Sequence, residues 1–316
     1  MKAFTRSVYG GPEVLTLQEV NKPELKEDQL LVKVMANSAN PADWHILRGK
    51  PFFARFVFGL FKPKNNLTGA DFAGIVSGIG SLVKEYKIGD RVFGEKLSGG
   101  AFAEYTAVSY DKCARMPEGT EFKEMAAVPI AGLTALQALI THGKLKKGES
   151  VLVNGSSGGV GHFTVQIAKA YGAKVIAVCS SKNEEFVRSL GADDVIAYDR
   201  EDIRRHNGNY DLIVDTHGNL TFAVFKRMGR RGVITGFTTM GHMISVSAAK
   251  AFSKYDMKQF TAEVNRNDLE TLASLIKERK IKVHIDKIYP FEKTPEALSY
   301  IEAMHTRGKV VMVWGI

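Results

Sequence analysis

Cysteine is scarce in this sequence, and long apolar runs are missing. The 316 residues include two cysteines, Cys113 and Cys179, which excludes a disulfide framework and a cysteine-rich zinc site. No apolar run approaches the ~18 residues of a membrane-spanning helix, and Met1–Arg6 lacks the apolar core of a secretory signal. These absences favour a cytoplasmic protein in a reducing compartment.

Blocks of like charge are also missing. The chain carries 43 Lys and Arg against 34 Asp and Glu, a net charge of +9, and the basic residues are scattered. Nucleic-acid binding depends on a basic patch or stripe, so we expect no nucleic-acid partner. A small cofactor that bears phosphate groups accounts for the excess charge more economically.

The length and the pattern predict two domains, since chains tend to divide above roughly 250–300 residues. The first ~119 residues read as β-rich, with short apolar runs between Gly- and Asp-containing turns, as in a small barrel or rolled sheet. The runs are Leu30–Ala36, Ile75–Ile79, Arg91–Phe93 and Phe102–Val108.

From Pro117 onward, short apolar strands alternate with helical patterns, which predicts a doubly wound parallel sheet. Asn183 and Asn219 are candidate caps of two of the helices. The expected strands are Val151–Val153, Val175–Cys179, Val195–Tyr198, Leu212–Asp215 and Val233–Gly236.

The last part of the chain predicts two more helices and a final strand. These are Asp268–Lys280, Pro295–Met304 and Lys309–Trp314. We expect the last ~35 residues to return and pack on the first domain. The predicted domains are therefore residues 1–119 with 281–316, and residues 120–280.

A glycine-rich turn follows the strand Val151–Val153 and opens a helical pattern. Its glycines read G-x-x-G-x-x-G (Gly155, Gly158 and Gly161), and a second strand follows the helix. Such a turn lets backbone approach a pyrophosphate, which the helix N-terminus attracts. We predict dinucleotide binding, with a nucleotide-free flavodoxin-like sheet as the alternative. The predicted contacts are Gly155, Ser156, Ser157, Gly158, Gly159, Val160 and Gly161.

The second strand ends without the acidic residue that commonly bonds the ribose 2′-hydroxyl of NADH. Ser180, Ser181 and Lys182 stand there instead. Hydroxyl groups and a lysine can bind a 2′-phosphate, whereas a carboxylate would repel it. This favours NADPH, although an ordinary solvated turn would leave the preference open.

Several ordered segments resemble the medium-chain dehydrogenase/reductase superfamily, over nearly the whole chain. They are Gly69–Val76, Gly89–Val92, Ala101–Tyr105, Ala127–Pro129 and Gly132–Ala135. The segment Asn40–Asp43 (N-P-A-D) and the glycine spacing are similar to the zinc-free quinone oxidoreductase branch, which includes zeta-crystallin-like and chloroplast-envelope-type members.

The resemblance implies a Rossmann domain inserted in a GroES-like β-rich catalytic domain, with an active-site cleft between them and frequent homodimers. It implies that Asn40 lies near the nicotinamide, where it bonds the ribose or a substrate oxygen; a turn-forming Asn before Pro is the alternative. It implies further cofactor contacts at Thr134, Tyr198, Phe237, Gly308 and Lys309. Three of these have alternatives: for Thr134 a residue of a buried helix that bonds its own backbone, for Tyr198 a buried strand-end aromatic, and for Lys309 a strand-start charge.

No metal site is predicted. Zinc-bearing relatives place a cysteine where this chain has Asn40 and a His-Glu pair where it has Ala70-Asp71, and the eight histidines show no metal-ligand spacing. Reduction of a conjugated double bond can proceed without a Lewis acid, because the enone delocalises the incoming negative charge. Asp43 is a second candidate catalytic residue; it would hold the loop, order a water or cap the following helix.

The resemblance implies that the substrates are quinones or α,β-unsaturated carbonyls. Together with the glycine turn, it predicts an NADPH-dependent, metal-free reductase of these compounds that acts by hydride transfer. A zinc-free alcohol or carbonyl dehydrogenase is one alternative. A non-catalytic NADPH-binding structural or sensor protein is another, because hydride transfer requires no diagnostic residue.

The stretch Phe52–Phe61 has aromatic and aliphatic residues at helical spacing with basic neighbours. A core-facing amphipathic helix, a lid over a hydrophobic substrate and a surface that touches membrane lipid all fit this pattern. Both functional interpretations favour a lipophilic substrate; membrane contact is not the expectation.

Overall fold

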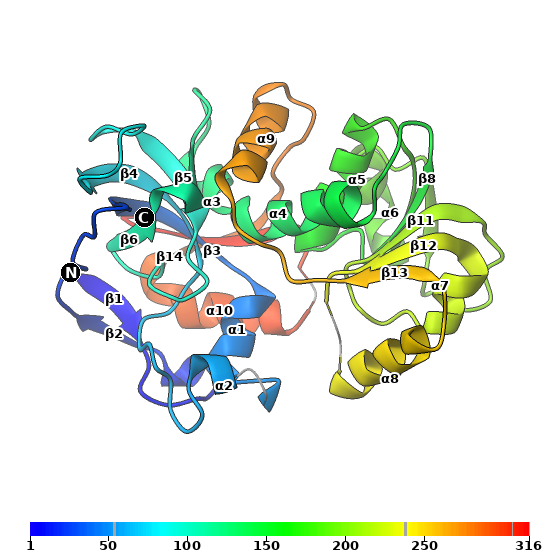
Figure 1. Ribbon diagram of the computed structural model, residues 1–316, viewed down its shortest axis with the longest axis horizontal. Helices are drawn as coiled ribbons and strands as arrows, with labels where there is room; N and C mark the ends of the chain where they lie inside the picture. The colour runs from blue at the N-terminus through cyan, green and yellow to red at the C-terminus, as the bar shows by residue number, and fades with distance from the viewer. Residues whose placement is uncertain (53–54, 237–238, 305, 316) are drawn as a thin grey trace. The chain divides into compact units, whose positions relative to one another are not determined.

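A computed structural model describes residues 1–52, 55–236, 239–304 and 306–315. The chain forms two units (Figure 1). Unit 1 comprises Met1–Ala131, Val264–Glu278 and Val283–Ile316, and unit 2 comprises Gly132–Glu263 and Arg279–Lys282. The domain limits predicted from the sequence, residues 1–119 with 281–316 and residues 120–280, stay a prediction.

Unit 2 is built on a parallel sheet, as predicted, and the sheet has six strands, one more than the five expected. The strand order is β10-β9-β8-β11-β12-β13. Counted from β8, this is 3-2-1-4-5-6, the order of dinucleotide-binding sheets. The strands are β8 (Ser150–Asn154), β9 (Lys174–Cys179), β10 (Asp194–Ala197), β11 (Tyr210–Asp215), β12 (Gly229–Ile234) and β13 (Asp256–Gln259).

Helices connect these strands. They are α5 (Gly159–Ala170), α6 (Glu184–Ser189), α7 (Phe222–Met228) and α8 (Met240–Ala251), together with a short 3-10 helix at Ser181–Asn183. Helix α4 (Pro129–Gln137) crosses from unit 1 to unit 2 and continues as a π-helical turn, Ala138–His142.

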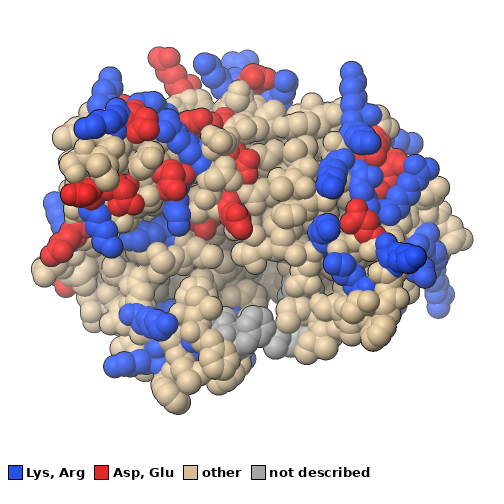
Figure 2. Space-filling model, viewed as in Figure 1, with Lys and Arg blue, Asp and Glu red and all other residues tan. Residues whose placement is uncertain are grey.

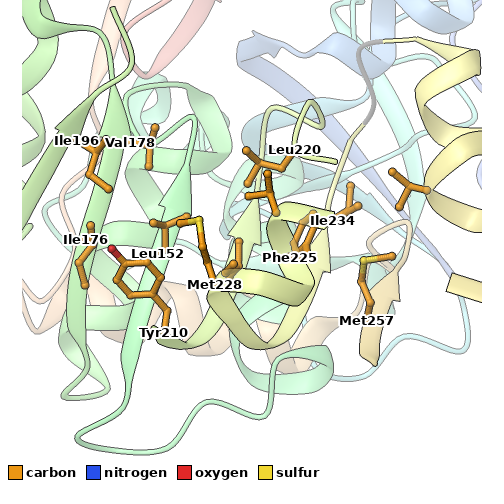
Figure 3. Packing of buried hydrophobic residues seen from close by; sticks show 13 residues of the cluster. Leu152, Ile176, Val178, Ile196, Tyr210, Leu220, Phe225, Met228, Ile234 and Met257 are labelled. Atoms are coloured by element: carbon orange, nitrogen blue, oxygen red, sulfur yellow. The ribbon is translucent and has the colours of Figure 1, made fainter. Parts of the chain in front are cut away.

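Buried apolar side chains fill the space between the sheet of unit 2 and its helices (Figure 3). Leu152 and Ile213 of the central strands and Phe225 of α7 have no exposed surface. Burying one such side chain contributes about 1.5–3 kcal/mol. The apolar runs of the sequence are continuous because side chains on both faces of these strands are covered.

Unit 1 contains the other sheet and both ends of the chain (Figure 1). Its main path runs β14-β15-β3-β4-β5-β7, β6 also pairs with β3, and β1 and β2 form a separate ribbon. The strands are β1 (Lys2–Thr5), β2 (Thr16–Glu19), β3 (Gln29–Ala39), β4 (Asp71–Ile79), β5 (Arg91–Glu95), β6 (Tyr105–Ser109), β7 (Cys113–Arg115), β14 (Ile285–Pro290) and β15 (Lys309–Val313).

The helices of unit 1 come from both parts of the chain. They are α1 (Pro41–Arg48), α2 (Arg55–Phe58), α3 (Phe122–Ala126), α9 (Arg266–Lys277) and α10 (Thr294–Glu302), with 3-10 helices at Pro12–Val14, Tyr110–Lys112 and Phe291–Lys293. Strand β15 pairs antiparallel with β3, Val310 opposite Ala39. This confirms that the end of the chain returns to the first domain. No helix among the described residues is long and apolar enough to cross a membrane.

Of the two predicted caps, Asn183 stands at the expected position and Asn219 does not. Asn183 is the N-cap residue of α6, but its side chain makes no capping bond; its Nδ2 donates to the hydroxyls of Ser157 and Ser180 at 3.1 and 3.2 Å. Asn219 accepts from Asn154 Nδ2 at 2.8 Å, and Thr221 stands at the N-cap of α7 instead.

The core-facing interpretation of Phe52–Phe61 is also wrong. Among its described residues only Arg55–Phe58 is α-helical, Phe52 is in a 3-10 conformation, and Phe52, Phe56 and Phe61 are exposed. Phe53 lies outside the described residues. The helical spacing of apolar residues therefore does not mark a buried face here.

We predict that Gly161→Ala destabilises the protein. A Cβ at Gly161 would lie 2.1 Å from the Gly155 carbonyl oxygen, which is backbone and cannot move freely. This overpacking costs about 1–3 kcal/mol or more and outweighs the gain of about 1 kcal/mol in helix propensity. Chemical denaturation measures the change. Gly158→Ala is the control, because its Cβ would meet only the Gly155 oxygen, at 3.5 Å; a Gly161→Ala protein as stable as this control would contradict the prediction.

Candidate functional site

The glycine turn of unit 2 joins strand β8 to helix α5. Gly155 has φ +77°, a conformation that favours glycine, and a Cβ there would lie 2.8 Å from Thr216 Oγ1. The amide of His162 donates to the Gly158 carbonyl at 3.0 Å, which closes the first turn of α5. The preceding N–H groups, at residues 159–161, therefore have no acceptor within the helix. They are positioned to bind an anion.

The turn also has room for such an anion. Within 4 Å of a Cβ built on Gly158 lies only the Gly155 oxygen, at 3.5 Å. Gly158, Gly159 and Val160 are partly exposed, whereas Gly161 is buried beneath the turn. The predicted residues thus fit the pyrophosphate of a dinucleotide.

The two serines of the turn differ in their surroundings. Ser156 is fully buried, and its hydroxyl donates to the Val178 carbonyl at 2.9 Å, so it ties the turn to β9. Ser157 is partly exposed and accepts from Asn183 Nδ2. Of the two, Ser157 is the one whose side chain can reach a ligand.

The end of β9 carries a feature that the sequence analysis missed. Ser181 donates to Asp199 from its hydroxyl at 2.7 Å and from its amide at 2.8 Å. These bonds hold the pKa of Asp199 below its usual range, so the carboxylate stays charged beside Ser181. Its position just after Tyr198, at the end of the neighbouring strand β10, was the available signal.

The remaining cofactor candidates lie in several places. Tyr198 is 58% exposed, which rules out the buried alternative and leaves its ring available to a ligand. Thr134 is buried in α4. Phe237 lies outside the described residues. Gly308 has φ +80°, and a Cβ there would lie 2.3 Å from the His284 carbonyl oxygen.

Unit 1 brings Asn40 and Asp43 together at the start of α1. Asn40 is the N-cap of α1. Its backbone N–H donates to Asp43 Oδ2 at 2.8 Å, so Asp43 caps the helix in its first turn. Both side chains are buried. The local N-P-A-D pattern is sufficient for this arrangement, because the Pro–Ala–Asp residues form the first turn.

Lys309 reaches the same place from the other end of the chain. Its ammonium donates to Asn40 Oδ1 and to the Ala39 carbonyl, the latter at 3.3 Å, and lies 3.7 Å from Asp71 Oδ2. Lys309 is 3% exposed and Asp71 is fully buried, which excludes a solvated strand-start charge.

Asp71 is a second residue that the sequence analysis missed. Its carboxylate accepts from Asn40 Nδ2 and Ser38 Oγ, both at 2.9 Å, and from the Ile130 amide at 3.1 Å. These bonds hold the Asn40 amide in one orientation. A polar residue within the otherwise apolar segment Gly69–Val76 was the signal that could have identified it.

Burial raises the pKa of every carboxyl group in this cluster. The pKa of Asp43 rises to about 7, helped by the nearby charge of Asp71, and that of Glu95 rises to about 8 for the same reasons. Burial also raises the pKa of Asp71 and lowers that of Lys309, while their mutual attraction opposes both shifts. The cluster therefore holds an exchangeable proton near neutral pH.

Asp43 also lines a pocket of about 240 Å³ that belongs to unit 1. Its wall is mainly apolar, with Arg6 and Lys64 as basic members. The apolar lining is Ile46, Leu47, Val57, Phe58, Leu67 and Leu97. Within the described part of the chain, no group of three or more His, Cys, Asp or Glu side chains is arranged to hold a metal.

Two family descriptions match the chain. Residues 26–118 match the alcohol dehydrogenase GroES-like domain, and residues 190–312 match the zinc-binding dehydrogenase family. The matched regions lie on both sides of the glycine turn, so they are independent of the motif that first suggested a dinucleotide.

Known proteins resemble the chain over its whole length. It is 33% identical to the chloroplast envelope quinone oxidoreductase homolog of Arabidopsis thaliana, covering 99% of this chain and 98% of the relative. It is 36% identical to the chloroplastic NADPH-dependent alkenal/one oxidoreductase of the same plant, over 99% and 79%. The solved quinone oxidoreductase of Coxiella burnetii has a TM-score of 0.88, 32% identity and 99% coverage of both chains. The chain belongs to the medium-chain dehydrogenase/reductase superfamily, in its quinone oxidoreductase branch.

Proposed function

We propose that the protein is an NADPH-dependent, zinc-independent reductase that transfers hydride to quinones or α,β-unsaturated carbonyls. The observation that carries this proposal is the open glycine turn, whose amides at residues 159–161 have no acceptor within α5. The names of the relatives, quinone oxidoreductase and alkenal/one oxidoreductase, support the substrate class.

When bound, the dinucleotide supplies the hydride. We propose that the glycine turn holds its pyrophosphate and that Ser157, Ser180, Lys182 and Tyr198 surround its adenosine end. The hydroxyl of Ser156 bonds the Val178 carbonyl, so its contribution is to shape the turn.

We propose that Asn40 is a positioning residue. Its Nδ2 donates to Asp71 at 2.9 Å and to the Ser38 carbonyl at 3.4 Å, which uses both of its hydrogens. Its oxygen accepts from Lys309 and has one further acceptor site. Asn40 can therefore accept from a ribose hydroxyl, but it has no hydrogen left to donate to a substrate carbonyl.

We propose that Asp43 supplies the proton. A hydride added to the β-carbon of an enone leaves an enolate, which must gain one proton to become the saturated ketone. Asp43 lines the pocket, and its pKa of about 7 keeps a fraction of the carboxyl protonated at neutral pH. A water between carboxyl and substrate would serve the same transfer.

A substrate screen tests the proposed function. NADPH consumption should accompany reduction of quinones or enones, and it should persist after treatment with a zinc chelator. Turnover confined to simple ketones or alcohols would favour the dehydrogenase alternative. Tight NADPH binding without turnover of any carbonyl would favour the sensor alternative.

The pH profile tests the role of Asp43. Because the protonated form donates, kcat/KM should fall as pH rises through about 7. Asp43→Asn, which keeps an acceptor for the Asn40 amide, should lower kcat by roughly 10²–10⁴-fold and flatten the profile. Glu95→Gln is the control, because Glu95 has a raised pKa but does not line the pocket. An unchanged profile in Asp43→Asn would assign the proton to another source.

The preference for NADPH has its own test. Lys182→Ala should weaken NADPH binding by roughly 10–100-fold and leave NADH binding unaffected, since a charge-assisted bond contributes about 1.5–3 kcal/mol. Asp199→Asn should tighten NADPH binding, because it removes a negative charge close to Ser181. Fluorescence titration at one salt concentration measures both dissociation constants. Equal changes for the two cofactors would refute the proposed phosphate site.

The cytoplasmic location and the homodimer expected from the sequence also remain proposals. Light scattering in solution measures the oligomeric state directly. The two predicted domains, residues 1–119 with 281–316 and residues 120–280, are a further proposal. Limited proteolysis would locate their boundaries.

A further inference from the structure

An exposed segment of unit 1 combines large apolar and basic side chains. We call residues 50–52 and 55–64 the apolar–basic segment. The exposed fractions of its apolar side chains are 91% for Phe61, 69% for Val57, 67% for Phe56, 60% for Phe52 and 38% for Leu60. Soluble proteins rarely leave several such side chains exposed together without a binding partner.

The segment is held in a defined shape. The Gly59 amide donates to the Arg55 carbonyl and the Lys64 amide donates to the Phe58 carbonyl, both at 2.8 Å. Tyr9 donates its hydroxyl to the Gly59 carbonyl at 2.6 Å. These bonds close a short loop, so residues 60–62 form its tip. The exposure of Phe61 is therefore a product of the fold.

The charge of this region has one sign. Between Asp43 and Asp71 the sequence contains five Lys and Arg residues and no Asp or Glu. Lys50, Lys62 and Lys64 are exposed. Figure 2 shows the result at its lower left, around α2, where basic side chains stand among uncharged ones and no acidic side chain is visible.

We propose that the apolar–basic segment docks on the surface of an anionic lipid bilayer. Aromatic side chains settle at the boundary of headgroups and acyl chains, and lysines around them reach the lipid phosphates. A protein partner fits less well, because lysine is depleted in protein interfaces.

The segment also adjoins the pocket that contains Asp43. Val57, Phe58 and Lys64 form part of the pocket wall. Docking would place this wall at the lipid surface, so a lipophilic quinone or enone could enter the pocket from the bilayer. This second step rests on the proposed function, whereas docking itself does not.

Vesicle flotation tests the docking. The intact protein should float with vesicles of phosphatidylcholine and phosphatidylglycerol, and much less with phosphatidylcholine alone. Two double variants should each weaken binding at least about tenfold: Phe56→Ser with Phe61→Ser, and Lys50→Glu with Lys62→Glu. Two matched double variants at other exposed positions of unit 1 serve as controls and should bind like the unmodified protein. They are Leu82→Ser with Ile88→Ser, and Lys84→Glu with Lys87→Glu.

Binding that is absent, indifferent to lipid charge or equal in all variants would overturn the proposal. A further outcome would also overturn it: the unmodified protein does not bind vesicles, and the double variant Phe56→Ser with Phe61→Ser no longer forms dimers. That result would assign the segment to contact with a second copy of the chain. Turnover separates this test from the proposed function. Reduction of a water-soluble enone should be unchanged in the segment variants, while reduction of a vesicle-embedded quinone should fall at least about tenfold.

Discussion

Unit 1 depends on one buried ion pair. Lys309 and Asp71 are both almost completely removed from solvent, and Asn40 bridges them with its amide. Removing one partner of such a pair costs about 3–5 kcal/mol, because the other charge is left buried. The three residues come from positions 40, 71 and 309, so the cluster also determines where both ends of the chain must meet.

Strand register brings these residues together. Ser38 pairs with Asp71 on one side of β3, and Ala39 pairs with Val310 on the other, which places Lys309 and Asp71 at the same end of the sheet. Helix α1 begins there, and its capping aspartate, Asp43, is buried beside the pair. Burial and the charge of Asp71 raise the pKa of Asp43, whereas the capping bond from the Asn40 backbone opposes that rise. A structural requirement has created a group suited to proton transfer.

How well the sequence predicted each feature depended on how local its cause was. Five strands of unit 2 were predicted because each contains a short apolar run, and the glycine turn because its glycines lie within one short segment, residues 155–161. Strand β13 was missed because its sequence, D-M-K-Q, has no such run. The cap at Asn219 was mispredicted because its side-chain oxygen accepts from Asn154, a residue distant in sequence. Asp71 and Asp199 were missed for the same reason: their partners include Asn40 and Ser181, which are remote along the chain.

The sequence by itself determined the family, the parallel sheet and the glycine turn, because these follow from spacing and periodicity. Only the tertiary structure decided that Lys309 is buried, that burial raises the pKa of Asp43 to about 7 and that Phe61 is exposed. Charge state and exposure depend on what surrounds a side chain. Those surroundings are assembled by strand pairing across hundreds of residues, which no local pattern records.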